Sequence, residues 1–269
     1  MIGICTDSSS QLPELLAARY GVEVVPVTVT INEHEYLEGV DLDVDEFYEM
    51  LGADPPPHVS TSQPSAGQFA AAYDQLLQRG CDEILSVHVA ASTSGTLNSA
   101  RLAARMLPIP VRLVDSGTAG FGVSCCVWAA GDAIANGADL DDAVHVAESL
   151  SPHIGAVFVA GQSGFVRTGN DPVGVPVMTA HEGRIDVVAR VPTLEAAAAT
   201  MAGTALDWGS RLNVAVGWAD PSSQVLSDTV ADSIYNAQNV AELARYRIGP
   251  SVGVYAGLGT VGCFMFPAN

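Results

Sequence analysis

The sequence contains no lysine, so its 11 basic residues are all arginine, against 30 acidic residues in a chain of 269. Schiff-base chemistry and the phosphate-binding loop of Walker-type nucleoside triphosphatases both require a lysine. The absence of lysine therefore excludes pyridoxal phosphate enzymes, Walker-type nucleoside triphosphatases and any lysine general base.

Positive charge is scarce overall, and the formal net charge is -19. A surface this acidic repels phosphate backbones and anionic lipid headgroups. No segment reaches roughly 18 uninterrupted apolar residues, and the N-terminus lacks a basic stretch followed by an apolar one. We expect a soluble, cytoplasmic protein that binds no nucleic acid and does not insert directly into a membrane.

Metal-ligand and disulfide spacings are also missing. The five cysteines form no Cys-x-x-Cys pair, and the six histidines show neither a His-Glu-x-x-His motif nor an i, i+4 pair. The acidic run at residues 33–46 lacks the register of a calcium-binding loop. We therefore expect buried, reduced thiols, no metal site and no cofactor.

The pattern that is present is an alternation of short β-branched runs with alanine- and leucine-rich periodic stretches. It predicts an α/β fold with two domains, residues 1–150 and 151–269. In the first domain the expected strands are Ile2–Cys5, Val22–Thr30, Glu83–Val89 and Val111–Val114. The expected helices there are Pro13–Tyr20, Val44–Leu51, Ser65–Arg79, Thr96–Met106, Thr118–Asn136 and Leu140–Leu150. This order favours a mainly parallel sheet.

The second domain has a more mixed texture and is expected to hold a mixed sheet. Its expected strands are Gly155–Ala160, Val173–Met178, Arg184–Arg190, Arg211–Trp218, Val252–Tyr255 and Val261–Phe266, and its expected helices are Leu194–Trp208 and Pro221–Asn236.

Two glycine motifs near the C-terminus fit known patterns without the context that those patterns need. Residues 257–262 fit G-x-G-x-x-G, but we interpret them as a tight turn between two terminal strands. Residues 249–253 fit G-x-S-x-G, yet a strand-like stretch follows and no histidine occurs after His181. Neither motif predicts a nucleotide site or a hydrolase.

Two hydroxyl-rich segments, residues 59–65 and 91–96, run directly into predicted helices. The first turn of a helix carries unpaired N–H groups and a partial positive charge, and Ser and Thr hydroxyls add further donors. Each segment is therefore a candidate anion-binding helix start.

Helix capping is the alternative for each segment, since Ser65 could cap its helix and Ser94-Gly95-Thr96 could simply begin the next one. The second segment follows the predicted strand Ile84–Val89 at its carboxyl end, where open α/β sheets bind ligands. Together the two segments predict a carboxylate or phosphate site at this edge.

Several segments resemble the DegV family. They are Thr6–Ser10, Thr61–Ser65, Ser94–Thr96 with Asn98–Ala100 behind it, Val114–Ser116, and residues 35–41 followed by 46–48. The resemblance implies a two-domain α/β protein that binds one long-chain fatty acid in a buried tunnel between its domains. A separate fatty acid kinase would then phosphorylate the carboxylate.

Carried over by position, the resemblance implies that Thr61 and Ser94 bond the carboxylate, with Ser62 and Gly95 beside them. The domain at 1–150 would carry these hydroxyl clusters, and the domain at 151–269 would close the lipid tunnel. No catalytic residue is implied.

The chain departs from the family pattern in two places. The family usually carries a histidine near the carboxylate in the last strand turn, where this sequence has Tyr255, which can still donate one hydrogen bond. The family's arginine-containing segment for kinase docking reads Ser163 to Asp171 here, with its arginine falling on Asp171. Arg190 matches a second docking arginine, with a solvated strand-end charge as the alternative.

Two other functions remain open at this point. One is a phosphotransfer-type enzyme with Ser94 or Thr61 as nucleophile, although no His or acidic residue lies within five positions of Ser94. The other is a regulatory scaffold that has lost the kinase connection.

Overall fold

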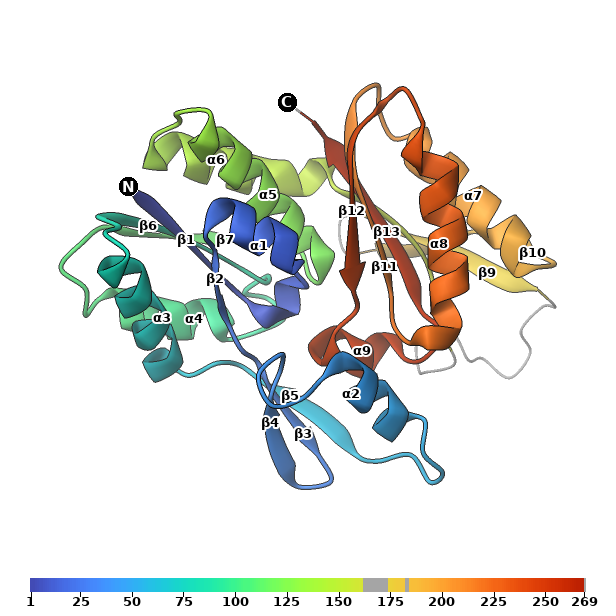
Figure 1. The fold of residues 1–269 in the computed structure, drawn as a ribbon, viewed down its shortest axis with the longest axis horizontal. Helices are drawn as coiled ribbons and strands as arrows, with labels where there is room; N and C mark the ends of the chain where they lie inside the picture. Colours follow the sequence, from blue (N-terminus) through green and yellow to red (C-terminus); the bar gives the residue numbers. More distant parts are fainter. Residues whose placement is uncertain (162–173, 182–183, 269) are drawn as a thin grey trace. The chain divides into compact units, whose positions relative to one another are not determined.

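The computed structural model describes residues 1–161, 174–181 and 184–268 (Figure 1). The chain forms two compact units. The first consists of Met1–Asp41 and Ser60–Ser151, and the second of Leu42–Val59 and the described part of Pro152–Asn269. Each unit is described by itself below.

The first unit is built on a parallel sheet with the strand order β2-β1-β6-β7. These strands are β1 (Ile2–Asp7), β2 (Glu23–Val25), β6 (Glu83–His88) and β7 (Val111–Asp115). The chain runs from β1 to β2 on one side and continues with β6 on the other side of β1. The strand order therefore reverses between β1 and β6, and the carboxyl ends of these two strands form the switch point where open α/β sheets bind ligands.

Helices cover both faces of this sheet (Figure 1). On one face lie α3 (Ala66–Gln78) and α4 (Thr96–Ala104), and on the other lie α5 (Phe121–Ala135) and α6 (Leu140–Leu150), with α1 (Glu14–Tyr20) packed against α5.

All five cysteines of the chain are buried and free, and burial raises the pKa of Cys126 and of Cys263 to about 12. The expectation of buried, reduced thiols is confirmed.

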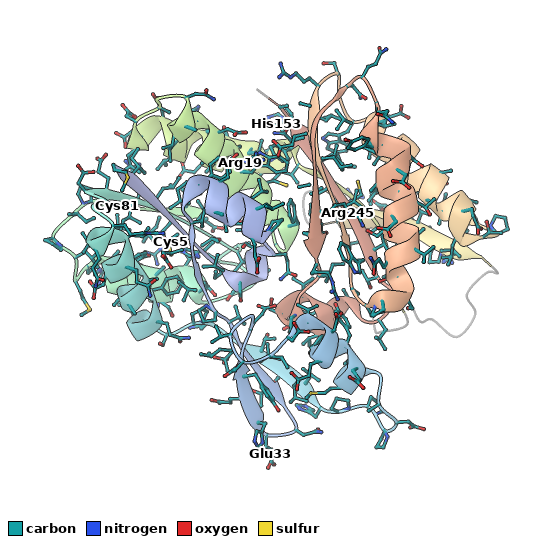
Figure 2. The ribbon with its side chains drawn as sticks, in the orientation of Figure 1. Cys5, Arg19, Glu33, Cys81, His153 and Arg245 are labelled. Carbon is teal, nitrogen blue, oxygen red and sulfur yellow. The ribbon has the colours of Figure 1, made fainter. Side chains whose placement is uncertain are left out.

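A small three-stranded sheet, in which β3 and β4 run antiparallel, extends from the same unit. Its strand order is β4-β3-β5, from β3 (Thr28–Ile31), β4 (His34–Leu37) and β5 (Val59–Ser62), and Figure 2 shows Glu33 at the tip of the β3–β4 hairpin. The single strand predicted at Val22–Thr30 is wrong, because β2 and β3 lie in different sheets. Pro26 stands between them and has no backbone N–H to donate to a ladder. Neither β4 nor β5 was expected.

The second unit is built on a mixed sheet with the strand order β10-β9-β8-β13-β11-β12. Its strands are β8 (Gly155–Val159), β9 (Val175–His181), β10 (Arg184–Val191), β11 (Leu212–Trp218), β12 (Val240–Arg247) and β13 (Val261–Pro267). β11 and β12 run parallel, and the other neighbouring strands run antiparallel. α7 (Leu194–Leu206) and α8 (Pro221–Tyr235) pack on this sheet over a core that includes Met201, Val214 and Val230.

The strand predicted at Val252–Tyr255 is wrong, because these residues lie in the short helix α9 (Pro250–Ala256). Pro250 occupies the first helical turn, where its missing N–H costs nothing. The glycine motif at 257–262 therefore joins a helix to β13, not one strand to another. The stretch that begins at residues 249–253 was expected to be strand-like and is helical instead. It follows β12, a strand that was not expected.

The predicted fold class, a mainly parallel sheet followed by a mixed sheet, is confirmed. α2 (Val44–Leu51), which packs against α9 in the second unit, and α6 begin and end at the expected residues. Among the described residues, no helix combines the length and apolarity needed to cross a membrane.

Candidate functional site

The two hydroxyl-rich segments adjoin in the first unit. A β-carbon added at Gly95 would overlap the side-chain amide of Gln63, whose carbon and nitrogen would both lie 2.8 Å away. The Gln63 side chain therefore packs directly on the Gly95 α-carbon. This contact joins the Thr61–Gln63 stretch to the start of α4, and we call these two stretches the hydroxyl cradle.

In the second segment, a compact turn holds Ser94 before α4. The backbone N–H groups of Thr93 and Ser94 both donate to the Ala90 carbonyl, at 2.9 and 3.2 Å. The Ser94 hydroxyl accepts the Thr96 N–H at 3.2 Å and lies 2.8 Å from the Thr96 hydroxyl. If Thr96 donates to Ser94, the Ser94 proton is available to a ligand oxygen.

In the first segment, capping and ligand binding fall to different residues. Ser65 caps α3: its hydroxyl accepts the Gln68 N–H at 3.2 Å, and its N–H donates to the Gln68 side-chain oxygen at 2.9 Å. Thr61 is half-buried on β5, and Ser62 is exposed. The capping alternative therefore accounts for Ser65 but leaves Thr61 and Ser62 without a capping role.

The start of the second segment is held by a carboxylate. Asp115, at the end of β7, accepts the N–H groups of Ala91 (3.2 and 3.3 Å) and Gly117 (3.0 Å). Because Asp115 already accepts the Ala91 N–H, any anion held at this edge must rely on the hydroxyls and on the N–H groups nearer to α4.

Sequence reasoning missed a buried polar chain directly at the switch point. His88 Nδ1 lies 2.8 Å from Asp7 Oδ2, and His88 Nε2 lies 2.7 Å from the Ser86 hydroxyl, which is 2.9 Å from the Tyr73 hydroxyl. Asp7 and His88 have no exposed side-chain surface. The signal in the sequence was only that Asp7 follows the predicted strand Ile2–Cys5 and that His88 lies near the end of the predicted strand Glu83–Val89. It did not show that β1 and β6 are neighbours.

The remaining expected site residues belong to the second unit. Tyr255 lies on α9, not in a strand turn, and its exposed fraction is 54%. Arg190 is half-buried on β10, the edge strand of the mixed sheet. The eroded docking segment, Ser163 to Asp171, lies outside the described residues. In the described part of the chain, no three His, Cys, Asp or Glu side chains form a group that could hold a metal ion.

A parallel sheet with hydroxyl-rich turns at its carboxyl edge, joined in one chain to a mixed sheet, defines a class of two-unit α/β proteins. The chain belongs to the DegV family, whose sequence model, described as an uncharacterised protein, matches residues 1–169. A DegV domain-containing protein of Deinococcus radiodurans is 32% identical over the whole chain and 99% of its own length. One from Streptomyces coelicolor is 29% identical over 97% of this chain and 96% of its own.

Solved structures share the fold over nearly the full length. A fatty-acid-binding DegV family protein from Thermus thermophilus has a TM-score of 0.82 at 26% identity, covering 99% of both chains. DegV of Bacillus subtilis, described as a fatty acid binding protein, has a TM-score of 0.81 at 21% identity, covering 99% of both chains. A stearic acid-binding protein from Eubacterium ventriosum has a TM-score of 0.84 at 20% identity, covering 99% of this chain and 98% of its own.

Proposed function

We propose that this protein binds one long-chain fatty acid and holds its carboxylate in the hydroxyl cradle, with Thr61 and Ser94 as donors and Ser62 and Gly95 beside them. The observation that carries the proposal is the contact of Gln63 with Gly95, since it sets Thr61 and Ser94 in adjoining segments at the ligand-binding edge of a parallel sheet. The likeness to the Thermus thermophilus fatty-acid-binding protein supports the choice of ligand.

The chemistry of a fatty acid suits a neutral cradle. Each buried CH₂ contributes about 0.8 kcal/mol, so a long acyl chain in a buried apolar tunnel supplies most of the binding free energy. The carboxylate then needs hydrogen bonds to replace those it loses from water. Hydroxyls and the N–H groups at the start of α4 provide them without a cation, which fits a chain that has no lysine.

The acyl group would be processed by another protein. We propose that the chain presents the carboxylate to a fatty acid kinase, with Arg190 on the exposed edge strand as a docking residue, and that it has no catalytic residue of its own. Tyr255 is proposed as one further donor to the carboxylate, on the family resemblance alone.

The phosphotransfer alternative has less support from the serines of this site. Ser86, His88 and Asp7 have the order and spacing of a hydrolytic triad, but Ser86 has no exposed surface. Among the described residues, Ser94 forms hydrogen bonds with Thr96 and with the Ala90 carbonyl. A serine so bonded has no base to accept its proton.

Native mass spectrometry of freshly purified protein tests the proposal. We expect one bound molecule with the mass of a long-chain fatty acid, and stearic acid should rebind after delipidation. The double substitution Thr61→Ala with Ser94→Ala should weaken rebinding by more than tenfold, since a hydrogen bond to a charged group contributes about 1.5–3 kcal/mol.

Ser233→Ala is the matched control, because Ser233 is exposed on α8 and its hydroxyl donates to the Thr229 carbonyl of the same helix. Its affinity should equal that of the wild type. Protein that carries no lipid and takes up no stearic acid would contradict the function. Unchanged binding in the double variant would contradict the assignment of the cradle alone.

A further inference from the structure

The His88 side chain contacts β1, α3 and a residue of its own strand, β6. Its Nδ1 faces Asp7 at the end of β1, and its Nε2 faces Ser86 within β6. Its ring makes a T-shaped contact with the Phe69 ring, with centroids 5.0 Å apart. Phe69 lies in the first turns of α3, directly after the Thr61–Gln63 half of the cradle.

The hydrogen bonds of this cluster run in one direction. A carboxylate only accepts, so the His88 proton lies on Nδ1 and points at Asp7. Nε2 of a neutral ring then accepts from Ser86, and the Ser86 hydroxyl accepts from Tyr73. The chain of donors ends on Asp7, and each polar atom in it has a partner, as burial requires.

Asp7 also holds the loop that follows β1 through hydrogen bonds. Its second carboxylate oxygen, Oδ1, accepts both the N–H and the hydroxyl of Ser9, in the short helix η1 (Ser8–Ser10). The Ser8 hydroxyl accepts the Val27 N–H at 2.9 Å and donates to the buried carboxylate of Glu38. Asp7 therefore fixes a serine-rich turn at the switch point.

His88 is equally close to the other half of the cradle along the chain. Its carbonyl accepts the Ser116 N–H at 3.1 Å, and two residues later Ala90 donates to the Thr118 carbonyl at 2.9 Å. The Ala90 carbonyl then closes the turn that ends at Ser94. The His88 ring therefore contacts β1 and α3, and the His88 backbone leads into this turn.

We propose that His88 and Asp7 are positioning residues for the hydroxyl cradle: the buried imidazole, held between Asp7 and Phe69, fixes helix α3, which follows Thr61, and the turn that carries Ser94. This inference rests on the proposed fatty-acid function. It assigns a role to two residues whose side chains are fully buried.

Two substitutions at the same position separate the contacts of His88. His88→Asn keeps an N–H near the place of Nδ1 and so keeps the bond to Asp7, whereas His88→Gln reaches Ser86 and leaves Asp7 without its partner. Both variants lose one buried hydrogen bond, so the midpoint temperature of thermal unfolding should fall in both. It should fall further in His88→Gln, because the bond lost there goes to a buried carboxylate. Stearic acid affinity should split, with a loss of less than threefold for His88→Asn and more than tenfold for His88→Gln.

His145→Asn is the matched control, because His145 is exposed on α6, and it should bind stearic acid like the wild type. A second measurement uses wild-type protein with ¹⁵N-labelled histidine and does not depend on the folding of any variant. Adding stearic acid to the delipidated protein should shift the ring nitrogen resonances of His88 and leave those of His145 in place.

The inference would be overturned if the wild type binds stearic acid and His88→Asn and His88→Gln bind it with the same affinity as each other. It would also be overturned if the His88 resonances do not respond to stearic acid. Both results would leave the fatty-acid function intact. Failure of the wild type to bind stearic acid would overturn the function and this inference with it.

Discussion

Tyr48 donates a buried hydrogen bond of 2.9 Å to the backbone carbonyl of Ile248, a residue 200 positions later in the chain. Tyr48 lies on α2, and Ile248 follows β12 immediately before α9. The aromatic rings of Phe47 and Tyr48 pack against Gly253 of α9. Contacts of this kind make residues 42–59 part of the second unit, although in the sequence they lie between the two segments of the first unit.

Tyr48→Phe should lower the free energy of unfolding by about 1–3 kcal/mol, because the buried Ile248 carbonyl would lose its partner. Urea unfolding followed by tryptophan fluorescence measures this change. Tyr235→Phe removes a hydroxyl from a side chain that is 72% exposed and should change stability by less than about 0.5 kcal/mol. Equal effects of the two substitutions would show that the Tyr48 bond does not stabilise the unit.

Gly253→Ala should also destabilise the second unit. The new β-carbon would lie 2.5 Å from the Tyr48 hydroxyl and 2.8 Å from the Phe47 ring, and overpacking of this kind costs about 1–3 kcal/mol. Gly203→Ala on α7 is the control, because nothing lies within 4 Å of the added carbon. There the better helix propensity of Ala should raise stability by about 0.5–1 kcal/mol. In differential scanning calorimetry, the midpoint temperature of unfolding should therefore fall for Gly253→Ala and rise for Gly203→Ala, relative to the wild type.

Gly95→Ala should weaken fatty acid binding while changing stability little. The backbone of Gly95 (φ −78°) accepts any residue, and the added carbon meets the movable end of the Gln63 side chain. Displaced Gln63 would disturb the neighbouring cradle hydroxyls, so the Kd for stearic acid should rise about tenfold, as measured by calorimetric titration. The second substitution Gln63→Ala should restore most of the affinity. A double variant as weak as Gly95→Ala would instead show that the glycine itself must approach the ligand.

Asp220→Asn should destabilise the second unit in a pH-dependent way. Burial acts to raise the pKa of Asp220, but the hydrogen bonds from Ser222, Gly259 and Ser223 together outweigh it, so the pKa lies below its ordinary value. The carboxylate therefore contributes stability above an ordinary Asp pKa of about 3.9, and this contribution is lost as the pH falls through the lower, folded-state pKa.

The difference in unfolding free energy between wild type and Asp220→Asn should accordingly be largest near neutral pH and shrink below about pH 4. Urea titrations at several pH values measure it. Asp232→Asn removes the same charge from the exposed surface of α8 and is the control. A difference that stayed constant down to acid pH would show that the charge of Asp220 contributes nothing.

Local signals in the sequence predicted those elements whose ends are decided locally. Asp43 and Asp139 cap α2 and α6 through their side chains, and both helices span the expected residues. Residues 252–255 alternate like a strand, yet Pro250 begins a helix there and Gly253 fits under Tyr48 and Phe47. β12 contains good helix formers such as Ala and Leu and is a strand because it pairs with β11.

The candidate site divides in the same way. Hydroxyl-rich segments before helices are visible in the sequence, so Thr61 and Ser94 could be proposed as site residues from the sequence alone. The Asp7–His88 pair spans 81 positions and exists because β1 and β6 are neighbours in the sheet. Strand order is a property of the whole fold, and no local pattern around His88 carries it.

The bond between Tyr48 and Ile248 also constrains when the second unit can fold during synthesis. At roughly 5–20 residues per second, a ribosome needs on the order of 10–40 s to travel from one residue to the other. During that interval α2 has left the exit tunnel without α9, and the apolar side chain of Phe47, fully enclosed in the finished protein, faces solvent or a chaperone. In the nascent chain, α2 therefore cannot complete its packing until α9 has been synthesised.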